Sequence, residues 1–332
     1  MPGPAPTGEA DSPVLSVLVL SHDYGAYLAA CLESVLAQTF PSVEVIVLDD
    51  GSRDDSLAIA HRYAADPRVR VVAHETNEGF VTTLREGTGV LSRGEFLVMV
   101  SADDLVLEPE TFARQVAALR VNPAVTACMT GFVKVGPRGE RIGRRRLVTR
   151  PRTLSGGAFA RRVLTKREFS VMHSGTVIRA SAYHAVGGYR TGLTNYGDFA
   201  LWMALSRVGP IALLEAACYG YRVHGAQMSG SPERRRAVLR EGIAVVRAEA
   251  ATARAAGVRV SDARALRARA ADLALADAFA GRRALALRRC ADVLAEVPGI
   301  ALTSAGWWMA ATRALLGRRA WAAMARFAPR RD

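Results

Sequence analysis

The sequence is poor in cysteine, and its few cysteines are far apart. They lie at positions 31, 128, 218 and 290, without any Cys-x-x-Cys pair. This spacing argues against a zinc site and a disulfide framework, and it favours a reducing compartment such as the cytoplasm. The opening residues 1–13 lack the basic start and apolar stretch of a secretory signal. Their Pro and Gly residues predict a flexible leader.

Acidic residues are scarce in the last third of the chain. From Glu233 to Asp332 there are 20 Arg and 9 acidic residues, so this part carries +11 of the net charge of +13. Such a tail indicates contact with an anionic surface or an acidic partner. Nucleic acid is not expected, because no binding motif accompanies the charge. A GC-rich coding sequence, which favours Arg and Ala, explains the bias equally well.

The tail also lacks an apolar run long enough to cross a bilayer. The stretch 299–311 is too short, and Arg313 follows it. Its aromatic residues favour an interfacial helix at the inner face of the plasma membrane; they are Trp307, Trp308, Trp321 and Phe327. A helical cap that packs on the rest of the protein, with solvated arginines, is the simpler alternative.

The first 120 residues alternate between short apolar runs and segments with helical spacing. The apolar runs are 14–21, 43–50, 69–75 and 95–104. Short β-branched runs of this kind are typical of strands buried on both faces, and the alternation predicts an α/β fold with a doubly wound, mostly parallel sheet. In the second segment that separates two runs, Ser52 and Asp55 resemble a capping box at a helix start.

The pattern changes after about residue 125. Strands are predicted over 126–136 and 211–225, and a strand followed by a short helix over 173–189. The basic stretch 138–152 is predicted to be a flexible connection. From about residue 232, Ala, Leu and Arg recur with helical periodicity. The predicted organisation is a leader over 1–13, a catalytic domain over 14–231 and a basic helical extension over 232–332.

Pairs of carboxylates end two of the predicted parallel strands. Asp49 and Asp50 follow one apolar run, and Asp103 and Asp104 follow another. Ligands of open parallel sheets bind beyond the carboxyl ends of the strands. Adjacent carboxylates repel each other, so this density indicates ligand donors or a hard cation that neutralises them.

Five motifs in order give the chain a specific resemblance. They are SVLVLSHDYGAYLAACLESVLAQTFPSVEVIVLDDGSRDDS, NEG, RGEFLVMVSADDL, GDFALW and YRVHGAQMS, and they span about residues 14–230. In this series the chain resembles the family 2 glycosyltransferases. The resemblance implies the GT-A fold (a Rossmann-like sheet flanked by helices), a nucleotide-sugar donor, inversion at the anomeric carbon and a Mg²⁺ or Mn²⁺ cofactor.

The resemblance also implies which residues form the site. Asp50 is expected at the nucleotide, supported by Asp49, and Asp198 is the expected catalytic base. Asp103 and Asp104 are expected at the metal and the ribose, and His224 at the metal. The other expected nucleotide-sugar residues are Ser21, Asp23, Asn77 and Arg85. His173 and Ser174 are the expected acceptor residues. Without the resemblance, Asp198 would be an N-cap and His224 a loop histidine.

Four segments depart from the family pattern. Ser101 replaces the first carboxylate of Asp-x-Asp-Asp, and Gly197 replaces a Glu before Asp198. The loop after the first strand reads SHDY where relatives have Tyr-Asn, and Leu84-Arg85 stands where they have Arg-Asn. These changes weaken the inference for contacts to the metal, to the nucleotide base and to the diphosphate. They also leave the class of acceptor open.

The sequence thus predicts an inverting glycosyltransferase that uses UDP-sugar by default, with dTDP and GDP as alternatives. The expected acceptor is a carbohydrate, a lipid-linked molecule or a small metabolite, in bacterial cell-envelope polysaccharide synthesis or secondary-metabolite glycosylation. A non-catalytic sugar-nucleotide-binding or scaffold protein is the first alternative. A nucleotidyltransferase is the second, and the lack of a Gly-rich phosphate loop near the first strand argues against it.

Overall fold

The computed structural model describes residues 13–165, 173–225 and 235–261, and single positions at 265, 284, 287, 290, 291, 294 and 311. The chain divides into two compact units. Residues up to 156 and residues 170–225 form the first, and residues 157–169 and those from 226 onward form the second. Residues 1–12 of the predicted leader (1–13) and the aromatic residues of the tail lie outside the described residues.

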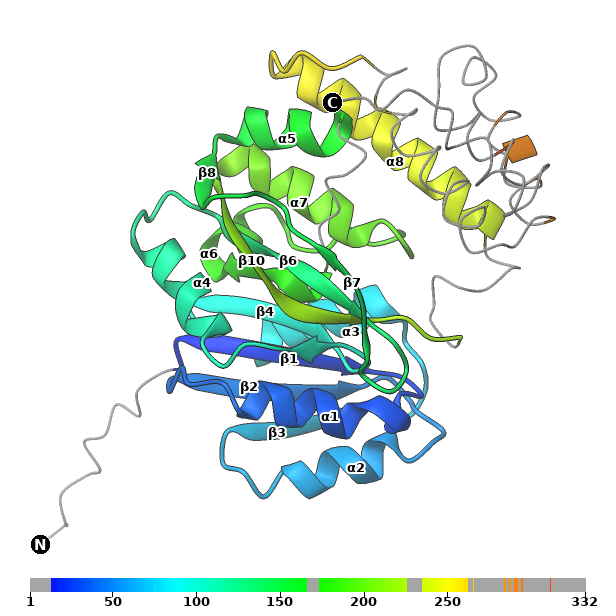
Figure 1. Ribbon diagram of the computed structural model, residues 1–332. Helices are drawn as coiled ribbons and strands as arrows, with labels where there is room; N and C mark the ends of the chain where they lie inside the picture. Colours follow the sequence, from blue (N-terminus) through cyan, green and yellow to red (C-terminus); the bar gives the residue numbers. More distant parts are fainter. Residues whose placement is uncertain are drawn as a thin grey trace, which may run out of the picture. The chain divides into compact units, whose positions relative to one another are not determined.

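Four parallel strands form one half of the sheet in the first unit. They lie in the order β3-β2-β1-β4 (Figure 1), and their bounds are Leu15–Ser21 for β1, Val43–Asp49 for β2, Val69–Ala73 for β3 and Phe96–Ser101 for β4. Every residue of β1 and β2 is buried. The continuous apolar runs of the sequence arise because helices cover both faces of this half.

Alternate side chains of these strands point to opposite helix layers. Val17 and Val45 belong to one core cluster with residues of α1 (Gly25–Leu36) and α4 (Thr111–Arg120). Leu18 and Leu48 face the other way, toward Gly87, where a π-helical turn (Gly87–Leu91) continues α3 (Phe80–Glu86). A Cβ at Gly87 would lie only 2.4 Å from Leu18 Cδ2, so only glycine allows this approach. The period-two pattern thus fixes which helix covers which face.

The other half of the sheet mixes parallel and antiparallel strands. β9 (Thr176–Arg179) runs antiparallel to both β4 and β6 (Ala127–Val135), and β10 (Ile211–Arg222) runs parallel to β6. The short β5 (Leu105–Val106) and β8 (Arg152–Leu154) add to β10 in antiparallel fashion. The parallel arrangement predicted from the alternation therefore holds for β1 to β4 and for the β6–β10 pair.

The basic stretch 138–152 is not simply the flexible connection that we predicted. It contains β7 (Arg141–Arg145), which pairs antiparallel with β6, and it reaches β8. The prediction was wrong because β7 has no apolar face: Arg141 to Arg144 are all exposed. Pairing of its backbone with β6, rather than burial of its side chains, holds this strand in place.

The remaining helices of the first unit are α2 (Ser56–Tyr63), α6 (Ala180–Ala185) and α7 (Gly197–Val208), with a 3₁₀ turn at His173–Gly175. The predicted capping box does not form, because α2 begins at Ser56 with Asp55 as an N-cap whose side chain makes no capping bond. Ser52 instead donates its hydroxyl to Asp49 Oδ2 at 2.6 Å. Asp49 thus closes the turn after β2.

The second unit contains most of α5 (Gly156–Thr165) and all of α8 (Arg235–Ala255). α8 lies in the part where helical periodicity was predicted, whereas α5 was not predicted; α5 buries Phe159, Val163 and Leu164. None of the helices among the described residues is long and apolar enough to span a bilayer.

Candidate functional site

The carboxylate of Asp104 is held rigidly beyond the end of β4. Ser174 Oγ donates to its Oδ2 at 2.6 Å, and the backbone N–H of Arg222 donates to its Oδ1 at 3.1 Å. Burial raises the pKa of Asp104 well above its ordinary value, Asp103 raises it further, and these two hydrogen bonds oppose the shift. Asp104 therefore joins three strand ends, those of β4, β9 and β10.

Asp103 forms a buried pair with His224, which lies just after β10. Asp103 Oδ2 lies 3.0 Å from His224 Nε2, and the two side chains are 8% and 2% exposed. Burial raises the pKa of Asp103, and the contact with His224 opposes that shift. The ring of His224 packs against Tyr24 and Tyr27, with centroids 5.8 and 4.6 Å away. Its Nδ1 is buried and has no hydrogen-bond partner within the described part of the chain.

The guanidinium of Arg222 stabilises the backbone next to this pair. Its Nε donates to the backbone oxygen of Asp103 at 2.8 Å, and one terminal nitrogen donates to the carbonyls of Gly136 and Pro137. The guanidinium carbon also lies 4.9 Å from the centre of the Tyr27 ring. These contacts connect the acidic strand end to the turn between β6 and β7, and they keep the buried carboxylates near a positive charge.

Asp50 holds a neighbouring loop in place. Its carboxylate is 4% exposed and accepts hydrogen bonds from the N–H groups of Glu78 and Gly79 and from His74. Burial by itself would raise the pKa of Asp50, but these donors outweigh it and the pKa is lowered. Adjacent Gly51 has φ +70°, and a Cβ there would lie 2.6 Å from the backbone of Thr76. Both residues thus bind β2 to the loop after β3.

Loops after β1 and β3 form a more open edge beside Asp50. Asn77 and Asp23 are exposed, and Asp23 has a left-handed backbone with φ 57°. His22 bridges the two loops, because its ring nitrogens lie 2.8 Å from Asn77 Nδ2 and from the backbone oxygen of Asp50. The hydroxyl of Ser21 is buried, and no described residue bonds to it. This edge offers exposed polar groups to a ligand.

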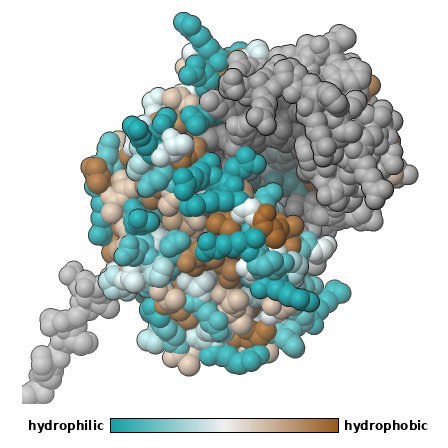
Figure 2. All heavy atoms as spheres, in the orientation of Figure 1, coloured by the Kyte–Doolittle hydropathy of each residue, from teal (hydrophilic) through white to brown (hydrophobic). Residues whose placement is uncertain are grey.

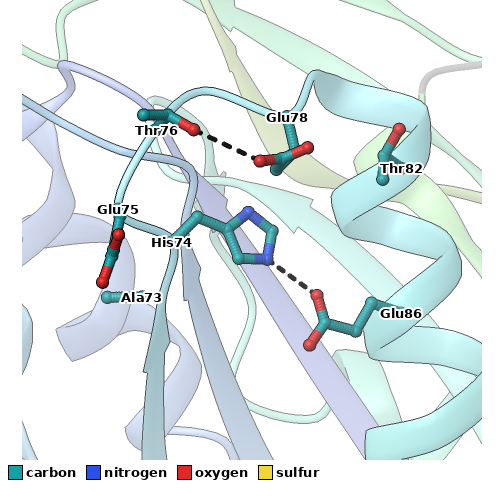
Figure 3. A pocket seen from close by; sticks show the side chains of 7 residues that line it. All are labelled: Ala73, His74, Glu75, Thr76, Glu78, Thr82 and Glu86. Carbon is teal, nitrogen blue, oxygen red and sulfur yellow. Dashed lines mark hydrogen bonds and ion pairs between the residues drawn. The ribbon is translucent and has the colours of Figure 1, made fainter.

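A hollow of about 550 Å³ lies next to this edge, with His74 at its centre (Figure 3). His74 Nε2 lies 2.7 Å from Glu86 Oε2, and its Nδ1 faces Asp50. The other lining residues are Ala73, Glu75, Thr76, Glu78 and Thr82. Three glutamates repel phosphate but accept hydrogen bonds from hydroxyl and amino groups, so the hollow suits the uncharged end of a nucleotide.

Our interpretation of the sequence missed His74 and Glu86. The available signal was positional: His74 directly follows β3, at the same edge of the sheet as Asp50. Glu86 ends α3, and nothing in the sequence shows that it faces His74.

Replacing His74 with Gln is expected to destabilise the protein by about 1–2 kcal/mol near pH 6, and by less near pH 9. Asp50 and Glu86 raise the pKa of His74 above 6.5, against the effect of burial. Its charge therefore stabilises the fold fully below that value, and this stabilisation is lost as pH rises through the raised pKa. Asp50, whose pKa is lowered, loses its share only as pH falls below about 3.8.

Urea unfolding at the two pH values measures the effect. His61→Gln on α2 is the matched control, because His61 is exposed and is expected to change stability little at either pH. Equal destabilisation of the His74 variant at both pH values would show that packing, rather than charge, holds this loop.

Two expected acceptor residues lie in the 3₁₀ turn before β9. The His173 ring packs on Phe80, with centroids 5.2 Å apart, and its Nδ1 lies 3.2 Å from the hydroxyl of Tyr189. Burial lowers the pKa of His173 to about 4, so the ring is neutral near pH 7. Ser174 Oγ is engaged between Asp104 and the N–H of Ser101. Ser174 thus holds the strand end together.

Asp198 lies in the first turn of α7, where Tyr196 is the N-cap. The N-cap interpretation of Asp198 is therefore not correct. Its Oδ1 accepts a hydrogen bond from the N–H of Phe199 at 2.6 Å. The pKa of Tyr189 is raised by burial, and the negative charges of neighbouring groups, including Asp198, add to this shift. Tyr189 lies beside Gly197, the residue before Asp198, because a Cβ at Gly197 would be 3.6 Å from Tyr189 Cδ1.

Short contacts connect most of the expected residues. Asp50 accepts a hydrogen bond from the N–H of Gly79. Phe80, which follows Gly79 in the sequence, packs on His173. Ser174, which follows His173, donates to Asp104. Tyr189, which lies 3.2 Å from His173 through its hydroxyl, also packs beside Gly197 at the start of α7. Short contacts thus link the strand ends of β2 and β4 to the start of α7.

The guanidinium of Arg85, which we expected at the nucleotide sugar, is engaged by the backbone of this chain itself. It donates to the backbone carbonyls of Gly187 and Tyr189, and so it fixes the turn after α6.

Comparisons with known proteins agree with this fold. The structure is similar to residues 1–349 of S. aureus TarS in complex with UDP-GlcNAc, with a TM-score of 0.62, 17% identity, and coverage of 91% of this chain and 88% of that one. It is also similar to the mannosyltransferase PcManGT from Pyrobaculum calidifontis in complex with GDP-Man and Mn²⁺, with a TM-score of 0.55, 18% identity, and coverage of 96% and 87%. At these identities the likeness shows the fold.

Among curated proteins, chondroitin synthase of Escherichia coli is 28% identical over 219 residues. The match covers 65% of this chain and 30% of that protein, so the chain spans less than a third of the synthase.

The fold and the strand-end carboxylates define a glycosyltransferase of the GT-A type. The family model of glycosyl transferase family 2 matches residues 16–187, and the chain belongs to that family.

Proposed function

We propose that this protein transfers a sugar from a nucleoside-diphosphate sugar to an acceptor hydroxyl, with inversion at the anomeric carbon. The observation that carries the proposal is the buried pair of Asp103 and His224 beside Asp104, at the strand ends of the sheet. A carboxylate and an imidazole that are so desolvated are costly unless they bind a charged partner. The default donor is a UDP-sugar.

Asp103 and His224 fit a divalent cation. Both are ligand types that Mn²⁺ accepts, and they lie side by side, whereas the carboxylate oxygens of Asp104 already accept hydrogen bonds from Ser174 and Arg222. No group of three or more His, Cys, Asp or Glu side chains in the described segments is placed to hold a metal ion. The nearest nitrogen and oxygen atoms of Asp103 and His224 lie 3.0 Å apart, so one cation could contact both side chains. Mg²⁺ and Mn²⁺ often bind through one or two protein ligands and substrate phosphates. When bound, the cation would stabilise negative charge on the leaving diphosphate.

The other residues have separate roles in this proposal. The nucleoside lies at the edge that Asp23, Asn77 and the His74 hollow form, while Asp50 keeps that edge in shape. Asp198 removes the proton of the attacking hydroxyl. Asp104 positions the strand ends, and His173 contributes a neutral aromatic surface on the acceptor side.

A thermal-shift screen of nucleotide sugars with Mn²⁺ tests the donor, since a ligand that binds only the folded state raises the melting temperature. The donor that shifts melting most should also release its nucleoside diphosphate in the presence of an acceptor panel. Binding without any turnover would favour the alternative of a non-catalytic nucleotide-sugar-binding protein. No shift with any nucleotide sugar would contradict the proposal.

A further inference from the structure

Basic residues crowd the segment that connects β6 to β8. Between positions 134 and 152, which we name the basic hairpin, there are eight basic residues and one acidic residue, Glu140. All the basic side chains except that of Arg145 are exposed. They are Lys134, Arg138, Arg141, Arg144, Arg145, Arg146, Arg150 and Arg152. The described surface in Figure 2 is largely hydrophilic on the side shown, with apolar residues interspersed.

These charges are not neutralised within the described part of the first unit. None of the eight basic side chains takes part in an ion pair there. Glu140 turns its carboxylate onto the hairpin backbone instead, where it accepts a hydrogen bond from the N–H of Arg138. Like charges at this density repel each other, so binding of an anionic partner stabilises the segment.

Protection of a sheet edge does not explain the number of charges. Charged residues on an edge strand prevent unwanted strand pairing. β3 is also an edge strand of the same sheet, and it carries only Arg70. β7 carries Arg141, Arg144 and Arg145 within five residues.

An apolar side chain decides which anionic partner fits. Ile142 lies in the middle of β7, and it is 55% exposed between Arg141 and Gly143. A hydrophilic polyanion gains nothing from this side chain. An anionic phospholipid surface can bind both the basic side chains and Ile142, because arginines contact the headgroups while an apolar side chain enters the interface.

We propose that the basic hairpin docks the protein on an anionic phospholipid surface. Its turn is fixed to the candidate site, because Arg222 donates both to the turn carbonyls and to the backbone of Asp103. A surface docked on the hairpin therefore lies close to Asp103. If the proposed function holds, this arrangement favours an acceptor that is presented on lipid.

Co-sedimentation of the full chain with vesicles tests the proposal. The probe is phosphatidylcholine vesicles with about 30% phosphatidylglycerol, compared with pure phosphatidylcholine. The wild type should bind only the anionic vesicles. The variant Arg141→Gln/Arg144→Gln/Arg146→Gln should bind them about 100-fold more weakly, because each of the three basic residues near such a surface strengthens binding about fivefold.

A matched control removes the same charge elsewhere. Arg62→Gln/Arg70→Gln/Arg120→Gln neutralises three exposed arginines outside the hairpin, and it should bind about as well as the wild type. Ile142→Asn should weaken vesicle binding and leave retention on heparin, a soluble polyanion, unchanged. Melting temperatures show that the variants fold, and vesicle binding requires no turnover, so failure here is separate from failure of the proposed function.

Equal binding of the two triple variants would overturn the proposal, because the basic tail or another surface would then account for the affinity. Unchanged vesicle binding of Ile142→Asn, together with loss of heparin retention in the hairpin variant, would assign the hairpin to a soluble polyanion and would also overturn it.

Discussion

Replacing Asp198 with Asn is expected to lower kcat by about 10²–10⁴-fold, the usual contribution of a general base. The amide oxygen can still accept the hydrogen bond from the N–H of Phe199, so the first turn of α7 should keep its shape. The amide cannot take up the proton of the attacking hydroxyl. The Kd of the nucleoside diphosphate should therefore change by less than about twofold. Steady-state kinetics and calorimetry measure the two quantities.

Glu110→Gln is the matched control for this prediction. Glu110 is also a carboxylate at a helix start, the N-cap of α4, and its side chain makes no capping bond. It is exposed, and its replacement should leave kcat unchanged. If the Asp198 variant kept normal turnover, another group would have to serve as the base.

Replacing Asp103 with Asn is expected to raise the concentration of Mn²⁺ needed for half-maximal effect by about 10–100-fold or more. The carboxylate supplies negative charge at the position 3.0 Å from His224 Nε2, and a neutral amide cannot replace that charge. EDTA should abolish turnover of the wild type, and added Mn²⁺ should restore it. Calorimetric titration of Mn²⁺ in the presence of UDP measures the metal affinity without turnover.

His224→Gln should weaken Mn²⁺ binding in the same direction, whereas Glu110→Gln should not. Removal of either member also leaves the other buried without its partner, so melting temperatures must be measured for each variant. Full activity in EDTA, or unchanged Mn²⁺ affinity in both variants, would show that the pair has a purely structural role.

The sequence predicted the parallel half of the sheet because burial on both faces leaves a direct trace. Strands β1 and β2 read as continuous apolar runs, and their ends carry the carboxylates that drew attention to the site. β7 left no such trace, because only its backbone is used in pairing. Burial restricts the types of side chain in a strand, so it can be inferred from the sequence, whereas backbone pairing at a sheet edge leaves no such pattern.

The sequence could not distinguish the roles of the two acidic pairs, Asp49-Asp50 and Asp103-Asp104. Asp49 and Asp50 mainly bind donors of this chain itself, namely Ser52, Glu78, Gly79 and His74. A strand-end carboxylate looks the same whether it binds a loop or a ligand. Asp103 and His224 are separated by 121 positions, so only the family resemblance suggested that they belong together.

The same long separation has a consequence for synthesis. Asp104 depends on Ser174 and on Arg222, which follow it by 70 and 118 positions. While a nascent chain emerges from the ribosome, the four parallel strands are complete long before either partner exists. Until both arrive, the carboxylate must stay hydrated, because burying it alone would cost several kcal/mol. The arrangement around Asp104 can therefore form only after β10 has been synthesised, and a translation product that stops before β10 would lack it.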